Sequence, residues 1–295
     1  QGLEGSSIAL FFSNLLEHKQ AHIIIANDLD EAGYLYNDLV QINGNDHILL
    51  FPSGYKRDIK YGQPDPPSEI LRTEVLNRLC QKGESLLIVT YPEAIAEKVV
   101  PVNMLSEQTL HIDKNSKCDI ITLSDKLRER GFEEVDYVYE PGQFAVRGSI
   151  LDVFSYTNEL PYRIDFFGKE VESIRTFEVE TQLSIGKLEE VYIVANVCGQ
   201  EASGISILDF IDKNTILICH NLSWVIDRIS TIASESLSEQ TLIAEEGDRY
   251  AMQKIIDVTA FQKKITTFRR IDYGASRRSF VSTAHHKVFI TKISI

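Results

Sequence analysis

The sequence predicts an α/β protein in which a three-layer, parallel-sheet domain is interrupted by an inserted antiparallel β-rich domain. Short apolar strands alternate with helices through residues 1–112, a pattern typical of a parallel sheet covered by helices on both faces. Strand runs separated by turns then continue to about residue 195, after which helix–strand–helix signals return. A chain that leaves an α/β domain and returns to it indicates an insertion, with expected boundaries at 1–114, 115–196 and 197–295.

The first domain is predicted from helix caps and short apolar strands. Ser6 or Ser7 can cap a first helix, and Asn27 or Asp28 can cap a second helix that runs to about Val40. The other predicted elements are strands at 22–27, 47–52 and 86–91, a helix from Ser68 closed by Gly83, and a helix whose first turn holds Pro92.

The inserted domain opens with a short helix at 124–131, where Ser124 is the expected N-cap and Gly131 the C-terminal stop. Three strand runs follow, and their turns predict antiparallel pairing. These runs lie at 143–154, with an interruption at Arg147-Gly148, at 161–167 and at 170–177.

The return to the α/β domain is predicted from residues 205–235, which contain the segments SILDFI, TILICHN and SWVIDRISTIASES. Trp224 lies on the amphipathic helix of the last segment and is expected in the core. Residues 236–295 are charged and are predicted to be irregular until the final alternation KVFITKISI.

Composition limits the classes of function. The formal net charge of −13 argues against broad binding to nucleic acid or to a membrane surface, because both need a cationic footprint. The four cysteines are far apart without a CxxC pair, as expected for free, buried thiols in a reducing cytoplasm. No apolar run reaches the roughly 20 residues of a membrane span, and the start has no basic signal-peptide region. We therefore expect a cytoplasmic protein.

The amino-terminal stretch GLEGSS is the first candidate for a ligand site. Gly2, Gly5, Ser6 and Ser7 could form the turn and cap of a phosphate-binding loop, but the lysine that reaches the terminal phosphates is absent. The residues favour a plain helix cap, with a degenerate phosphate loop as the alternative. Neither is expected to bind nucleotide.

Other chemistry is weakly indicated. The loop after residue 52 mixes two tyrosines with basic residues, which could stack on a nucleic-acid strand, although the acidic total favours a solvated loop. His285 and His286 have no partner at metal-ligand spacing and are interpreted as polar surface. No catalytic set of residues can be assembled.

Two arginines inside the apolar strand runs have two possible explanations. Arg147 could pair with Asp152 across a hairpin, and Arg163 could pair with Asp165 or Glu172, as surface ion pairs of about 0–1 kcal/mol. Alternatively, two guanidinium groups beside the aromatic pair at 166–167 would form a protein-binding hot spot, where arginine and aromatic residues are enriched. The pattern alone leaves these explanations balanced.

The sequence contains the motifs FAVRGSILDVF, PYRIDFFGKEVESIRTF, VETQ, YGQPDPPSEILRTEVLNRL and LLIVTYPEAI. These motifs resemble the module shared by the excision-repair protein UvrB and the transcription-repair coupling factors, and the resemblance covers residues 1–235. UvrB carries a lysine in its phosphate loop and a long aromatic β-hairpin. This sequence lacks the lysine, and the loop from Tyr61 to Ser68 leaves no room for the hairpin. It is therefore more similar to the amino-terminal, degenerate helicase-like module of a coupling factor.

The resemblance implies a module without catalytic activity and without a cofactor of its own. Its inserted domain would recruit UvrA through Arg147, Arg163 and Phe167. In the full-length chain, carboxy-terminal domains would pack over this surface. Those absent domains would bind RNA polymerase and move along double-stranded DNA with ATP and magnesium. The alternative from another class is a UvrB-like helicase subunit that binds damaged DNA.

One departure concerns the end of the chain. The family usually continues with a segment like HKNFDL, whereas this sequence ends HHKVFITKISI. We interpret the last dozen or so residues as a frame-shifted end.

Overall fold

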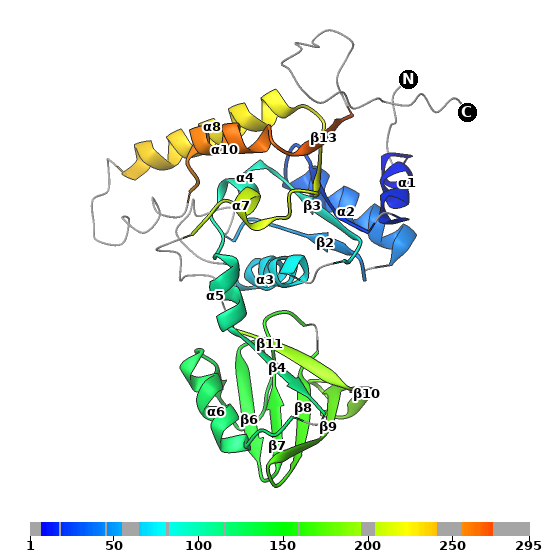
Figure 1. Cartoon of the computed structure of the whole chain (residues 1–295), viewed down its shortest axis with the longest axis vertical. Helices are drawn as coiled ribbons and strands as arrows, with labels where there is room; N and C mark the ends of the chain where they lie inside the picture. The colour runs from blue at the N-terminus through cyan, green and yellow to red at the C-terminus, as the bar shows by residue number, and fades with distance from the viewer. Residues whose placement is uncertain are drawn as a thin grey trace.

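The computed structural model describes residues 7–17, 19–44, 46–54, 65–80, 83–114, 116–158, 160–195, 204–240 and 255–273. They form an α/β unit and a β-rich unit, which Figure 1 shows one above the other with α5 between them. The loop after residue 54, the histidine pair at 285–286 and the chain end that we interpret as frame-shifted lie outside the described residues.

The α/β unit contains both the early and the late part of the described chain. Its elements are α1 (Ser7–Ser13), the 3-10 helix η1 (Asn14–Glu17), β1 (Ala21–Ile25), α2 (Leu29–Asn43), β2 (Ile48–Leu50), α3 (Pro66–Cys80), β3 (Leu86–Thr90), α4 (Pro92–Ala96), α5 (Val102–Glu107), α7 (Ile207–Phe210), β12 (Ile216–Cys219), α8 (Leu222–Gln240), α10 (Val258–Ile265) and β13 (Arg269–Asp272).

Its sheet is parallel, with the strand order β13-β12-β1-β3-β2. All five residues of β3 are buried, so both faces of this central strand are covered. The connections from β1 to β2 and from β2 to β3 run in opposite directions across the sheet. Because such crossovers are right-handed, α2 and α3 lie on opposite faces. The predicted three-layer α/β architecture is confirmed.

The insertion follows from the pairing of β12 with β1. Ile216 of β12 lies opposite His22, so the returning chain adds a strand beside the first strand of the sheet. Between β3 and β12 the chain builds the β-rich unit, as the sequence predicts.

The β-rich unit is built around an antiparallel sheet. Its elements are β4 (Thr109–Asp113), α6 (Ile120–Glu129), β5 (Glu133–Glu134), β6 (Gln143–Arg147), β7 (Ile150–Val153), β8 (Tyr162–Phe167), β9 (Glu170–Phe177), β10 (Ser184–Leu188) and β11 (Glu190–Val194). Six strands form a sheet in the order β10-β9-β8-β7-β6-β5, in which only the short β5 is parallel to its neighbour. The strands β4 and β11 form a separate antiparallel ribbon.

The two units have separate hydrophobic cores. The larger core belongs to the α/β unit and includes Leu105 of α5. The second core packs one face of the six-stranded sheet against α6 and the ribbon, through residues such as Ile164, Leu127 and Ile112. We call this face the inner face. The opposite, outer face carries only a small cluster of Val138, Ala145, Phe154 and Phe177.

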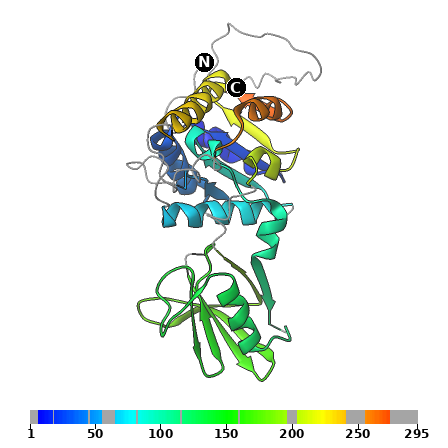
Figure 2. The ribbon, with the colours of Figure 1, turned by 90° about the vertical axis from the view of Figure 1, so that its left-hand side faces the viewer.

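Two connecting segments meet where the chain enters and leaves the β-rich unit. Val99 and Ile205 exchange a pair of backbone hydrogen bonds, each 2.8 Å between nitrogen and oxygen. Figure 2 shows the lower unit from the side, joined to the α/β unit through α5 and the ribbon. The insertion therefore begins and ends at neighbouring points of the α/β unit.

Some predicted helix starts are wrong. The helix α3 begins at Pro66 rather than Ser68. Likewise, α6 begins at Ile120, where Asp119 accepts the capping hydrogen bond. Ser124 therefore lies inside α6 and donates to the carbonyl oxygen of Ile120 at 2.7 Å, because a hydroxyl group can also bond one turn back within a helix.

Two predictions of burial are also corrected. Trp224, expected in the core, is 39% exposed, because α8 turns this side of its amphipathic surface outward. The thiols of Cys80, Cys118 and Cys219 are free as predicted, but only Cys219 is buried, and Cys80 is exposed. Cys80 ends α3, where its side chain is not enclosed by the sheet.

Regular structure also occurs where the sequence was expected to be irregular. Asp257 caps α10 by accepting a hydrogen bond from the backbone nitrogen of Ala260 at 2.7 Å. The strand β13 pairs in parallel with β12 at the edge of the sheet. Its sequence, RRID, has too little apolar alternation to indicate a strand, because an edge strand can carry charges at no cost to the core.

Candidate partner-binding surface on the outer face

The predicted partner-binding residues lie on one face of the β-rich sheet. Arg147 is the last residue of β6, and Phe167 is the last residue of β8. Arg163 and Phe167 share the outer face of β8, since side chains alternate along a strand and the intervening Ile164 and Phe166 are buried in the inner core. Arg147 lies opposite Ile150, which lies opposite Asp165 of β8. The outer face thus contains all three predicted residues.

A buried carboxylate holds both arginines. The Asp152 side chain is fully buried, and its Oδ1 accepts from Arg163 Nε at 2.7 Å. Its Oδ2 accepts from Arg163 Nη2 at 2.8 Å and from Arg147 Nη2. The Arg163 contact is bidentate, which is the strongest geometry for a guanidinium and a carboxylate. Asp152 therefore fixes the position of both guanidinium groups.

Aromatic rings and backbone groups complete the positions of the two arginines. Arg163 lies 4.3 Å above the ring centre of Phe177 and donates from Nη1 to the carbonyl oxygen of Gln182 at 2.9 Å. Arg147 lies 4.8 Å from the ring centre of Tyr137. Hydrogen bonding to Asp152 raises the pKa of the Arg163 guanidinium further above neutrality. The positive charge of Arg163 is thus permanent.

The ion-pair prediction is therefore half correct. Arg147 pairs with Asp152 as expected. Arg163 also pairs with Asp152, and not with Asp165 or Glu172, because the register of β7 and β8 places Asp152 directly opposite it. Asp165 instead accepts from Arg175 and from the Ser173 hydroxyl, each at 2.5 Å.

The three predicted residues differ in accessibility. Phe167 is 78% exposed and is the most accessible of them. The side chain of Arg147 is 33% exposed, while that of Arg163 is only 13% exposed. Phe167 is therefore the most accessible to a partner, Arg147 is partly accessible, and Arg163 mainly supports the surface from within.

The structure describes only one of the four residues predicted to form a degenerate phosphate loop. Gly2, Gly5 and Ser6 lie outside the described residues, and Ser7 is the first residue of α1.

No cluster of histidine, cysteine and acidic side chains that could hold a metal ion occurs in the described parts of the chain. Nor does any described helix have the length and apolarity needed to cross a membrane.

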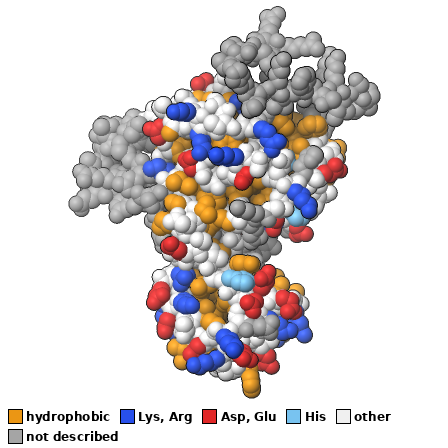
Figure 3. Space-filling view, viewed as in Figure 1, with side chains coloured by type: hydrophobic (Ala, Val, Ile, Leu, Met, Phe, Trp, Pro, Cys, Tyr) orange, Lys and Arg blue, Asp and Glu red, His pale blue; other side chains and the backbone are white. Residues whose placement is uncertain are grey.

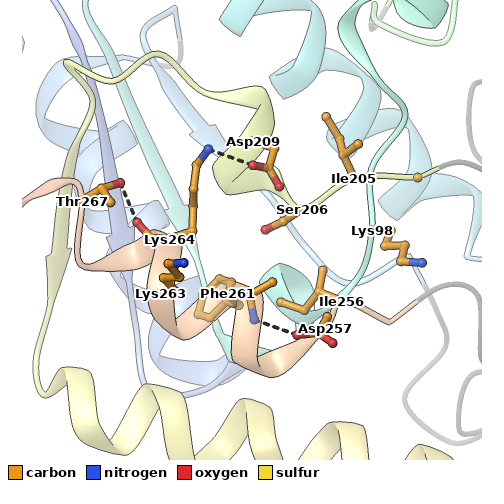
Figure 4. Close-up of a pocket in the computed structure, with 12 residues that line it drawn as sticks. Lys98, Ile205, Ser206, Asp209, Ile256, Asp257, Phe261, Lys263, Lys264 and Thr267 are labelled. Atoms are coloured by element: carbon orange, nitrogen blue, oxygen red, sulfur yellow. Dashed lines mark hydrogen bonds and ion pairs between the residues drawn. The ribbon is translucent and has the colours of Figure 1, made fainter.

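A cavity of about 500 Å³ lies in the α/β unit, away from the outer face. Figure 4 shows it between α7, α10 and the connecting segments. Lys264 closes one side by pairing with Asp209 at 2.9 Å, and Asp257 is occupied in capping α10. Ile205, Ile256 and Phe261 make its lining largely apolar. No catalytic arrangement is formed there by the described residues.

The β-rich unit is similar to a known class of module. Residues 110–197 match the family model of the UvrB interaction domain. This range covers nearly all of the ribbon, α6 and the six-stranded sheet, so the unit that carries the outer face is similar to the UvrB interaction domain.

The more particular relatives are transcription-repair-coupling factors. The chain is 32% identical over 193 residues to that of Bacillus subtilis, which covers 65% of this chain and 16% of the relative. It is 28% identical over 195 residues to that of Escherichia coli, which covers 65% of this chain and 17% of the relative. It is 30% identical over 191 residues to that of Haemophilus influenzae, which covers 63% of this chain and 16% of the relative. The chain is thus homologous to transcription-repair-coupling factors and spans about a sixth of their length, which confirms the resemblance in the sequence.

Proposed function

We propose that this chain is the interaction module of a bacterial transcription-repair coupling factor, and that it recruits UvrA through the outer face of its β-rich unit. The module acts in the cytoplasm and has no catalytic activity of its own. ATP-driven movement on DNA and contact with RNA polymerase belong to other domains of the parent protein. Domains from the carboxy-terminal part of that protein cover the outer face until repair begins.

The exposure of Phe167 carries this proposal. A phenylalanine exposed to 78% on the outer face contributes nothing to either core of the fold. Exposed aromatic side chains beside arginine are typical of protein-binding hot spots, and Arg147 on the same face is held in place by Asp152. The sequence resemblance implies UvrA as the partner of this surface. The match to the UvrB interaction domain supports the same partner.

Substitution of Phe167 by alanine tests the proposal. We expect F167A to weaken binding of purified UvrA by about thirtyfold or more, because hot-spot truncations cost about 2 kcal/mol or more. Unfolding by heat should change little, since the side chain is exposed. Affinity can be measured by biolayer interferometry with the immobilised chain.

A matched control is Tyr34→Ala. Tyr34 is an aromatic residue of nearly equal exposure, 76%, but lies on α2 of the other unit. We expect Y34A to bind UvrA like the unaltered chain. Equal affinities for F167A and Y34A would contradict the proposed surface, and absence of UvrA binding by the unaltered chain would contradict the proposed function. ATP turnover by the chain alone, tested with and without damaged duplex DNA, should be undetectable.

A further inference from the structure

The outer face contains a row of like charges that the proposed contact residues do not explain. In register across the sheet, Asp152 lies opposite Arg163, Arg163 lies opposite Arg175, and Arg175 lies opposite Lys187. Residues directly opposite one another in antiparallel strands lie on the same face. We call Arg163, Arg175 and Lys187 the cationic row. It runs from β8 across β9 to β10, which is the edge of the sheet.

This arrangement leaves an excess of positive charge. Like charges directly opposite one another in a sheet are destabilising, and two carboxylates, Asp152 and Asp165, offset only part of the charge of Arg147 and the cationic row. Lys187 is exposed and has no ion-pair partner among the described residues. Glu170 lies opposite Phe167 at the far end of β8 and β9, so the excess is concentrated at the row.

We propose that the partner-binding surface extends from Phe167 across the cationic row to β10, and that it receives an acidic patch of UvrA beside an apolar pocket. This inference rests on the proposed function and adds Arg175 and Lys187 as specificity-determining residues. Strands lie about 4.8 Å apart, so the row spans roughly 10 Å, and Phe167 lies roughly 13 Å along β8 from Arg163. A protein interface of ordinary size, about 800 Å² on each partner, covers both.

A protein fits this surface better than a nucleic acid. The chain as a whole carries a formal charge of −13, so its positive potential is local. The same unit exposes the apolar side chains of Phe167, Leu183 and Ile185. Leu183 follows Gln182, whose carbonyl oxygen accepts from Arg163, and Ile185 is on the same strand as Lys187. Figure 3 shows acidic and basic side chains interspersed over the visible face of the β-rich unit, without an extended basic track. Tight nucleic-acid binding uses about six to ten phosphate contacts, more than this row can make.

Charge reversal of Lys187 tests the inference. We expect K187E to weaken UvrA binding by about tenfold at low ionic strength, with a smaller loss as salt is added, because interfacial charges act through screened attraction. The matched control is Lys126→Glu, which makes the same change in net charge. Lys126 is an exposed residue of α6, on the inner side of the sheet. K126E should bind within about twofold of the unaltered chain.

The two proposals fail in different ways. If F167A weakens UvrA binding while K187E and K126E behave alike, the extended surface is wrong and the proposed function stands. If the unaltered chain does not bind UvrA, the proposed function itself is wrong. Binding of an undamaged DNA duplex that K187E abolishes and K126E preserves would assign the row to nucleic acid and overturn the inference.

Discussion

At the scale of single residues, Asp152 determines how the outer face is built. Leaving this fully buried carboxylate unpaired would lower the stability of the fold by several kcal/mol, so both of its guanidinium partners have a structural role. The two arginines differ in how far their side chains are exposed. The sequence suggested pairing and recognition as alternatives for these arginines. Pairing is confirmed for both arginines, whereas recognition stays a proposal: Arg163 is chiefly a structural partner, while Arg147 keeps a third of its side chain exposed. An arginine can serve the fold with one edge and a partner with another.

Removal of each arginine should therefore have a graded effect on stability. We expect R163A to lower the free energy of unfolding by about 3 kcal/mol, because it leaves the buried Asp152 carboxylate without its bidentate partner. R147A should cost less, about 1–2 kcal/mol, since it removes one of the carboxylate's contacts and this side chain is one-third exposed. Urea denaturation measures both values.

The reference for this series is R128A. Arg128 pairs with Asp125 and Glu134 on the exposed surface of the same unit, so its loss should change the free energy of unfolding little. An R163A variant as stable as R128A would mean that Asp152 does not depend on Arg163. For the same reason, reversing the charges of Arg147 and Arg163 together is expected to unfold the β-rich unit, which makes F167A the cleaner probe of binding.

Prediction at this scale was limited by register. The Arg147–Asp152 pair could be predicted because a short hairpin at Arg147-Gly148 fixes which residues meet. The partner of Arg163 could not, because the loop between β7 and β8 leaves the register of these strands open. Asp165, two residues along β8 and on the same face as Arg163, was therefore as good a candidate as a residue of β7. The cationic row depends on three such registers and was not visible in the sequence.

At the scale of elements, local signals were sufficient where they coincided. β9 occupies the predicted range, and Asp28 caps α2 as predicted. α10 was missed although its N-cap aspartate and its last-turn lysines were present, because the surrounding charged segment obscured its apolar face. β13 is defined by its neighbour β12 rather than by its own sequence, which is tertiary context that no local pattern contains.

Two glycines of the β-rich sheet provide a test at this scale. Gly142 (φ 90°) and Gly148 (φ 64°) both have left-handed backbone, which costs a non-glycine residue roughly 1 kcal/mol. An added Cβ at Gly142 would also overlap the Tyr156 hydroxyl group, whereas at Gly148 it would meet open space. We expect G148A to lose about 1 kcal/mol of stability and G142A about 3 kcal/mol.

Thermal unfolding measures both glycine variants. The difference between them isolates the steric overlap from the backbone strain that they share. Equal losses would mean that Tyr156 moves aside at no cost. Gly148 lies in the turn that follows Arg147. If this turn positions the Arg147 guanidinium group, the affinity of G148A for UvrA should also fall.

At the scale of the whole molecule, the two cores define where the units divide. The sequence predicted the insertion because its pattern changes from strand–helix alternation to hairpins and back again. It could not place the junction, because β4 resembles another strand of the α/β domain. In the structure Leu105 of α5 packs in the α/β core and Ile112 of β4 in the β-rich core, so the division falls between them, close to the start of the matched range at residue 110. The domain limits at 114 and 196 remain predictions.

Excision tests whether the units fold independently. The β-rich core is formed by residues between Leu110 and Ala195, so a fragment of residues 108–196 contains it entirely. We expect this fragment to unfold cooperatively and to bind UvrA as tightly as the whole chain. The remainder should also fold when a short glycine–serine linker joins its cut ends, because the Val99–Ile205 bridge holds together the two segments that lead to the cut and closing a short loop costs little entropy.

Circular dichroism and UvrA affinity of the two parts decide the outcome. A folded fragment that binds UvrA would establish the β-rich unit as the complete recognition module, with the α/β unit acting as its support. An unfolded fragment would mean that the β-rich core needs contacts from α5 and the connecting segments. A folded fragment that has lost affinity would instead place part of the UvrA contact on the α/β unit, and the outer face alone would no longer account for recruitment.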